Sequence, residues 1–202
     1  MNDGLLIVLS GPSGSGKDSV LKMLVRRNEN IRLSVSATTR PPRDYEEHGR
    51  DYYFVSKEEF LYMTEQGEVF EYAEYCGNYY GTPKKPVFDW MSKRLDVIFE
   101  IEVNGAMQVK DSHPEVISIF IMPPSIDELE KRLRSRGSDS DESILKRLDT
   151  AKVEMKAAVV YDYVVINDVI EDAVASIEAI LSAEKHKSKF MNEFIEGVVV
   201  HD

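Results

Sequence analysis

Short continuous runs of apolar residues predict the buried strands of this chain. The clearest runs are residues 5–9, 97–101 and 116–122, and a shorter one is 163–166. They do not alternate with polar residues, which is typical of parallel strands that helices cover on both faces. Apolar residues at helical spacing lie between these runs. The expected helices are residues 20–25, 125–134, 143–158 and 169–181.

Strands that alternate with helices indicate an α/β domain. Residues 33–82 have a different pattern, because they are rich in Tyr, Thr and Gly and alternate in short segments such as 51–55 and 69–75. This pattern predicts a small mixed β insertion. We therefore expect a core of residues 1–32 and 83–185 with a lid at about 131–150, an insertion at 33–82 and a C-terminal extension at 186–202.

Two capping signals lie in or beside the insertion. Ser56 and Glu59 form a capping box, which predicts a helix that starts after Ser56. Thr82 followed by Pro83 fits an N-cap and a first-turn proline, which predicts a second helix start.

Composition narrows the class of protein. The chain has 202 residues and a formal net charge of −11, which argues against a nucleic-acid coat or an anionic-membrane binder, since both need basic surface. The single cysteine, Cys76, excludes a disulfide within the chain, and we expect it on a strand without a catalytic partner. Neither a signal peptide nor a membrane-spanning run is evident. We expect a soluble cytoplasmic protein, either a monomer or a homo-oligomer.

The sequence after the first predicted strand has the spacing of a phosphate-binding loop. Glycines let the backbone turn its N–H groups toward an anion, and the following helix adds positive potential at its N-terminus. The lysine reaches the β- and γ-phosphates as a mobile charge. A Gly/Ser-rich turn is the alternative, but strand, loop, lysine and helix occur in the required order. The loop consists of Gly11, Pro12, Ser13, Gly14, Ser15, Gly16 and Lys17.

Asp18 departs from the usual pattern of this loop. The position after the lysine is normally Ser or Thr, whose hydroxyl contacts Mg²⁺. Three roles are open for Asp18: it holds the metal through water, caps the start of the helix, or lies in solvent.

The chain resembles the guanylate kinase family over residues 5–181. That resemblance implies a P-loop NTPase-type parallel sheet core flanked by helices, a small mixed β GMP-binding insertion and a helical lid. It also implies transfer of the γ-phosphoryl of ATP to GMP with Mg²⁺, giving ADP and GDP, with dGMP as a further acceptor. The motifs that carry it, in order, are residues 11–17, 34–43, 49–55, 77–82, 100–105, 123–125, 131–137 and 167–168.

The resemblance assigns the acceptor site. It implies that two arginines and two tyrosine hydroxyls hold the GMP phosphate, and guanidinium forks suit a phosphate well. It makes Glu71 the guanine reader, since a carboxylate has two acceptors for the adjacent N1–H and 2-amino donors. Ser36 and Thr82 match positions at the other base edge. The implied GMP-binding residues are Ser36, Arg40, Arg43, Tyr52, Glu71, Tyr80, Thr82, Glu100 and Glu102.

Two glutamates at the end of a predicted core strand have more than one possible role. Glu100 and Glu102 are two residues apart, so both are expected to point to one side, where ligands of open α/β sheets bind. The resemblance implies that they serve Mg²⁺, guanine or ribose, and does not say which does which. A core ion pair with Lys or Arg is the alternative for each.

The resemblance also assigns the donor side. The basic stretch at 131–136 and Arg147 match a lid whose arginines stabilise charge in the transition state. Asn167 matches a position near adenine, although capping of the next helix is an alternative. The implied catalytic residues are Lys17, Arg40, Arg132, Arg136 and Arg147, and the implied ATP-binding residues are 11–18 and Asn167.

Two other functions remain open from the sequence. A guanylate-kinase-like module that has lost catalysis would bind peptides or phosphoproteins, and a related kinase would act on another nucleoside monophosphate. The intact loop and lid argue against the first, and Glu71 with Thr82 argues against the second. The extension at 186–202 has helix-like apolar spacing and is an extended helix, a docking tail, a subunit contact or a frayed end.

Overall fold

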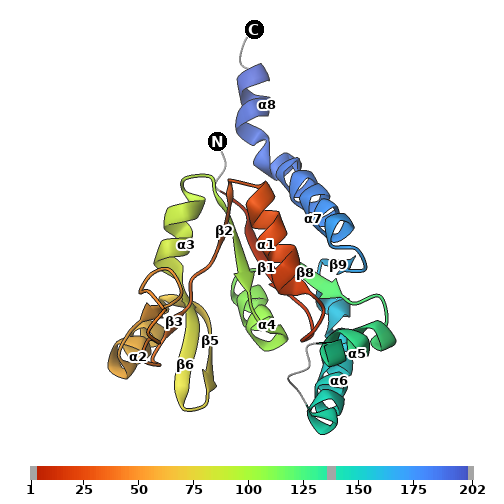
Figure 1. Ribbon diagram of the computed structural model, residues 1–202. Helices are drawn as coiled ribbons and strands as arrows, with labels where there is room; N and C mark the ends of the chain where they lie inside the picture. Colours follow the sequence, from red (N-terminus) through yellow and green to blue (C-terminus); the bar gives the residue numbers. More distant parts are fainter. Residues whose placement is uncertain (1–3, 136–139, 200–202) are drawn as a thin grey trace.

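A parallel five-stranded sheet forms the centre of the computed structural model, which describes residues 4–135 and 140–199. The strand order is β2-β7-β1-β8-β9, so segments far apart in the chain lie side by side. This confirms the expected α/β class, with parallel strands joined through helices (Figure 1). The strands are β1 (Leu6–Ser10), β2 (Ile31–Leu33), β7 (Asp96–Glu100), β8 (Ile117–Met122) and β9 (Tyr163–Ile166).

Helices cover both faces of this sheet, which explains why its inner strands are apolar throughout. On one face, α1 (Lys17–Arg27) and α7 (Ile170–Lys185) pack over alternate side chains of β1 and β8. On the other, α3 (Lys84–Met91) and α4 (Val103–Ser112) pack over the remaining ones. Because side chains alternate between faces, each inner strand supplies both cores.

A second sheet forms a separate lobe beside the core. Its order is β4-β3-β6-β5, with parallel and antiparallel pairs, and α2 packs on it through the buried Phe60. The α5–α6 pair forms the opposite lobe, closed by its own apolar cluster (Figure 1). The elements are β3 (Ala37–Thr38), β4 (Tyr53–Phe54), α2 (Lys57–Glu65), β5 (Val69–Tyr75), β6 (Asn78–Pro83), α5 (Ile126–Ser135) and α6 (Asp141–Lys156).

The C-terminal extension begins against the core and ends away from it. A short 3₁₀ turn, Ser188–Phe190, places Phe190 against the α1–α7 core, and Lys187 pairs with the buried Glu184 at 2.7 Å. Helix α8 (Asn192–Val199) then projects from the body (Figure 1). The residues up to Phe190 are therefore anchored and do not form a frayed end.

Several local predictions are confirmed. Ser56 accepts a hydrogen bond from the Glu59 backbone N–H at 3.1 Å, and Ser125 accepts one from the Glu128 N–H at 3.1 Å. Both hydroxyls therefore cap helices as expected. β9 differs from expectation, because it is an edge strand whose Ile166 is 61% exposed.

Strand β2 was not predicted, because three residues carry too little pattern. Two other predictions are wrong. Thr82 does not cap α3: it lies in β6, Pro83 precedes the helix, and the Thr82 hydroxyl bonds Glu71 instead. Cys76 is not on a strand but in the turn between β5 and β6, with a φ of 49°.

Candidate active site

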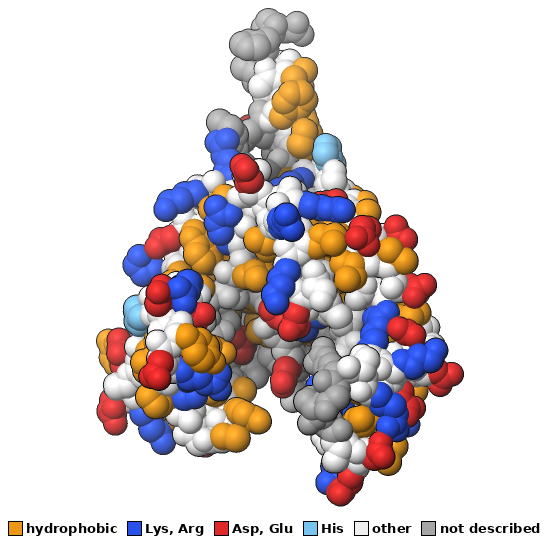
Figure 2. Space-filling model, viewed as in Figure 1, with side chains coloured by type: hydrophobic (Ala, Val, Ile, Leu, Met, Phe, Trp, Pro, Cys, Tyr) orange, Lys and Arg blue, Asp and Glu red, His pale blue; other side chains and the backbone are white. Residues whose placement is uncertain are grey.

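Two adjoining cavities open beyond the carboxyl ends of the core strands. The P-loop cavity, of about 480 Å³, is lined by residues 11–19, and the small-sheet cavity, of about 400 Å³, by β5, β6 and the start of α4. Figure 2 shows the surface hollowed between the two lower lobes. Ligands in the two cavities would therefore be neighbours. The walls that both share are Tyr52, Glu100, Ile101 and Glu102.

The loop between β1 and α1 has the backbone of an anion cradle. Gly14 and Gly16 have φ of 91° and 84°, a region that L side chains rarely adopt. Gly11 is also constrained, since a Cβ there would lie 2.5 Å from the Ile121 carbonyl oxygen. Gly16 directly precedes α1, so the amides of the first turn face an anion without competition from a capping side chain.

Lys17 is paired with a carboxylate in the P-loop cavity. Its Nζ forms a short ion pair with Glu100 Oε1 at the end of β7 and lies 3.7 Å from Asp18 Oδ1. Asp18 is in the first turn of α1 with its side chain 76% exposed. Gly16 holds the N-cap position, so the proposal that Asp18 caps the helix is wrong.

Asn167 lies beneath the loop. It is 1% exposed, and its Nδ2 donates to the Ser15 carbonyl oxygen at 2.7 Å. It does not cap α7, because Val169 precedes that helix without a side-chain cap. A Cβ on Gly16 would lie 2.4 Å from Asn167 Nδ2, so loop and side chain fit only with glycine at 16. Asn167 therefore supports the loop from below.

Two arginines of the α5–α6 lobe contact the loop. Arg132, on α5, donates to the carbonyl oxygens of Ser15 at 3.4 Å and Asn167 at 3.0 Å and pairs with Glu128. Arg147, on α6, donates to the Ser13 hydroxyl. Both guanidinium groups therefore reach the anion-binding loop from the opposite lobe. Arg136, the third arginine assigned from the sequence, lies outside the described residues.

The small-sheet cavity contains a buried carboxylate. Glu71, on β5, is 7% exposed, and its Oε1 accepts a hydrogen bond from the Thr82 hydroxyl at 2.7 Å. Burial raises the pKa of Glu71, and the hydrogen bond from Thr82 acts in the opposite direction. Thr82 is fully buried and outside the cavity lining, whereas Ser36 and Tyr80 line it. Thr82 thus orients the carboxylate.

Arg40, which follows β3, lies beside the wall of this cavity. The Arg40 guanidinium sits over the Tyr52 ring, 5.5 Å from its centroid, and the Tyr52 and Tyr80 rings are 6.1 Å apart. Arg43 is more exposed, and its NH1 donates to the Tyr45 hydroxyl at 3.0 Å. Arg40, Tyr52 and Tyr80 are thus brought together, with Tyr52 in the wall that both cavities share. Arg43 is joined to Arg40 only through Glu46 among the described ion pairs.

The P-loop cavity has three glutamates in its wall, and the sequence did not suggest one of them. Glu102 directly precedes α4, one position beyond the predicted strand end, and lines both cavities with Glu100. Glu154, from α6, also lines the P-loop cavity. Burial and the nearby Glu102 charge raise the pKa of Glu154. The position of Glu154 in the sequence did not indicate a site residue, because only the packing of α6 places it in the P-loop cavity.

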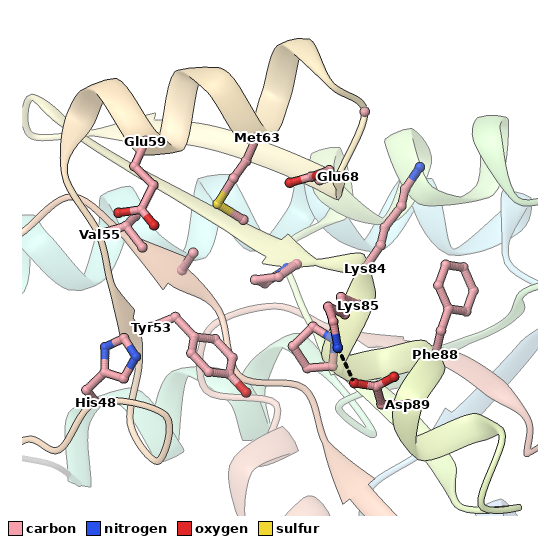
Figure 3. Close-up of a pocket in the computed structure, with 14 residues that line it drawn as sticks. His48, Tyr53, Val55, Glu59, Met63, Glu68, Lys84, Lys85, Phe88 and Asp89 are labelled. Atoms are coloured by element: carbon pink, nitrogen blue, oxygen red, sulfur yellow. Dashed lines mark hydrogen bonds and ion pairs between the residues drawn. The ribbon is translucent and has the colours of Figure 1, made fainter.

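A larger cavity, of about 640 Å³, lies between α2, the small sheet and α3 (Figure 3). Its walls include Tyr53, Met63 and Phe88, and Lys85 pairs with Asp89 at 2.9 Å. Its described lining contains no P-loop residue, and its cations are Lys84 and Lys85. This cavity lacks the P-loop of the first cavity and the buried Glu71 carboxylate of the second, so its larger volume does not identify the site.

Sequence comparison identifies the family. The family model described as guanylate kinase matches residues 4–184. The chain belongs to the guanylate kinase family. It is 50% identical over 197 residues to the guanylate kinase of Desulfitobacterium hafniense (strain Y51), covering 98% of both chains. It is 48% identical over 202 residues to that of Carboxydothermus hydrogenoformans, covering 99% of both chains.

A solved structure agrees with this guanylate kinase assignment. The crystal structure of guanylate kinase from Anaplasma phagocytophilum matches with a TM-score of 0.69 and 40% sequence identity, covering 92% of this chain and 88% of that one. In the described part of the chain, no helix combines the length and apolar character needed to cross a bilayer.

Gly16→Ala tests the fit between loop and asparagine. The added Cβ meets Asn167 at a backbone angle that alanine disfavours, so we expect ATP affinity to fall at least about tenfold, measured by titration calorimetry. Gly77→Ala is the matched control, because Gly77 has a φ of 76° but nothing within 4 Å of an added Cβ. An equal loss in both variants would refute the role of the Asn167 contact.

Proposed function

We propose that this guanylate kinase family member transfers the γ-phosphoryl of ATP to GMP, giving ADP and GDP. The observation that carries the proposal is the pair of adjoining cavities, one built on the P-loop and the other holding a buried carboxylate, with Arg40 over the ring of Tyr52 in their shared wall. Two anionic ligands bound there would meet at the shared wall. Family membership and the names of the relatives support the same reaction.

The acceptor phosphate is held by Arg40, Arg43, Tyr52 and Tyr80 in this proposal. Planar guanidinium groups bind phosphate oxygens with two parallel N–H donors, and phenol hydroxyls add single donors. The stacking of Arg40 on Tyr52 places one such group at the cavity wall. An acceptor phosphate at this wall would point toward the P-loop cavity, as in-line transfer requires.

Guanine is selected by Glu71. Its free carboxylate oxygen and the one bound by Thr82 are both acceptors, which match the adjacent N1–H and 2-amino donors of guanine. Adenine offers a bare N1 acceptor at this edge and would leave a buried charge facing lone pairs. Ser36, also in the lining, supports the other base edge.

The donor triphosphate is held by the P-loop amides and Lys17. With no nucleotide bound, Glu100 neutralises Lys17. A triphosphate would replace this partner, because its charge is larger and the loop amides add to the attraction. Asn167 and Arg132 hold the Ser15 carbonyl oxygen and so keep the loop backbone in its cradle shape. Asn167, which is buried, assists binding from outside the anion site.

Mg²⁺ would accompany ATP and neutralise charge on the phosphoryl group. This metal binds through one or two carboxylates plus substrate phosphates and needs no dedicated protein cage. Asp18 and Glu100 both line the P-loop cavity and fit that pattern through water. Within residues 4–135 and 140–199, no group of three or more potential metal ligands is gathered.

Transfer requires no general base on the protein. The attacking atom is a phosphate oxygen that is already anionic, so positioning and charge neutralisation supply the rate enhancement. Arg132 and Arg147 reach the loop from the lid and are placed to contact a bound triphosphate. Their charge would stabilise the transferring group, and lid closure would exclude water.

Glu71→Gln tests the acceptor assignment. The amide presents one donor where guanine needs two acceptors, so we expect kcat/KM for GMP to fall about a hundredfold while ATP affinity stays within about twofold. The assay couples ADP release to GMP, dGMP, AMP, UMP or CMP as acceptor. Equal weakening of GMP and ATP would contradict the assignment.

The wild-type acceptor panel separates the other functions. Turnover with AMP, UMP or CMP in preference to GMP would indicate a different nucleoside monophosphate kinase. Nucleotide binding without turnover of any acceptor would indicate a binding module that has lost catalysis.

The raised pKa of Glu71 predicts an acid limit on GMP use. Only the ionised carboxylate binds both guanine donors, so kcat/KM for GMP should fall as the pH drops through a pKa above the ordinary 4.5. Thr82→Val removes a hydrogen bond that lowers this pKa, so the fall should move to higher pH. A pH profile at saturating ATP measures both. A shift toward lower pH would contradict the account.

A further inference from the structure

Glu46 closes the loop that carries the two acceptor-site arginines. Its side chain is only 5% exposed, although the neighbouring Arg43 side chain is 61% exposed. Both carboxylate oxygens accept from Arg40 NH2, at 2.8 and 3.0 Å, and Oε2 also accepts from the Arg43 backbone N–H at 2.8 Å. One carboxylate therefore ties the side chain of one arginine to the backbone of the other.

Arg40 is held from several directions at once. NH1 donates to the Pro41 carbonyl oxygen at 2.7 Å, and the guanidinium lies 5.5 Å from the Tyr52 ring centroid and 5.9 Å from that of Phe54. A guanidinium has five N–H donors, so these contacts leave donors for an anion. An unrestrained arginine would lose side-chain entropy on binding phosphate. Because these contacts already fix the Arg40 side chain, most of that entropy is lost before phosphate binds.

The Glu46 carboxylate is charged in this setting. The hydrogen bond from Arg40 is the main cause that lowers the pKa of Glu46, and the Arg43 backbone N–H acts in the same direction. Its negative charge has two opposite effects on an incoming phosphate. It orders the arginines, and it also repels the anion, but the repulsion is reduced because the Arg40 guanidinium already pairs with this charge.

We propose that Glu46 is a positioning residue for the acceptor phosphate, which holds Arg40 and the Arg43 backbone so that both guanidinium groups converge on it. This rests on the proposed function, because it takes these arginines as the phosphate clamp. Ordering outweighs repulsion: the carboxylate fixes one guanidinium and one backbone segment, whereas its charge is already balanced by Arg40.

Glu46→Gln separates this role from a general structural one. The glutamine side chain keeps one acceptor oxygen, but it has no negative charge and lacks the second oxygen that accepts from Arg40. We expect KM for GMP to rise about tenfold, with KM for ATP and the inhibition constant of guanosine, which lacks the phosphate, each within about twofold of wild type. Glu47→Gln is the matched control, because Glu47 is 68% exposed and its carboxylate pairs with the exposed Arg50 at 2.7 Å.

Three outcomes would overturn the proposal. An unchanged or lowered KM for GMP would mean that the carboxylate merely competes with phosphate. An equal loss of GMP and guanosine binding would mean that Glu46 only supports the small-sheet lobe. An equal rise in KM for GMP in Glu47→Gln would mean that removing any negative charge from this loop weakens GMP binding.

A second variant guards against misfolding. Glu46→Asp keeps the charge but is one methylene too short to reach both partners, so it should show the same phosphate-selective loss. Full guanosine and GMP affinity in Glu46→Asp would also overturn the proposal. If wild-type protein does not phosphorylate GMP, the proposed function itself fails, whereas wild-type turnover with an unaffected Glu46→Gln variant overturns only the role of Glu46.

Discussion

Electrostatic repulsion between two polyanions is the constraint on which this site depends. Two unit charges about 4 Å apart repel by about 4 kcal/mol at an effective dielectric constant of about 20, and a triphosphate facing a monophosphate carries several such pairs. The chain as a whole adds to the problem, since its net charge is −11. Cations close to the phosphates must therefore neutralise this repulsion, because the net charge of the chain cannot. Lys17, Arg40, Arg132 and Arg147 are gathered from three different lobes around two adjoining cavities.

These cations are held by acceptors when no nucleotide is bound. Glu100 pairs with Lys17, Glu46 with Arg40, and Glu128 with Arg132. Each pairing keeps a long, flexible side chain near its working position, which reduces the entropy lost on binding. The ion pairs differ in whether they are expected to break when the nucleotide binds. Glu100 lies in the cavity wall where the ligand arrives, whereas Glu46 lies behind the guanidinium and can remain in contact with it.

The sequence predicted the parts of the fold and site that are encoded locally. The apolar runs located β1, β7 and β8, the Ser56 and Ser125 caps were confirmed, and the loop at 11–17 has the glycine conformations that its motif requires. Contacts between distant elements were not predictable from local pattern. Asn167 meets Ser15 across 152 positions, and Glu154 joins the cavity only because α6 packs there. Thr82 was expected at a helix start, but its strand position turns it toward Glu71.

The most direct measurement is a crystal structure with GMP and a non-hydrolysable ATP analogue bound together. The account predicts the GMP phosphate within hydrogen-bond reach of Arg40 and Arg43, guanine on Glu71, and the analogue's terminal phosphate facing it from the P-loop. It also predicts that Lys17 has left Glu100 for the analogue. GMP lodged in the cavity between α2 and α3, or any pose that leaves the two arginines without phosphate, would contradict it.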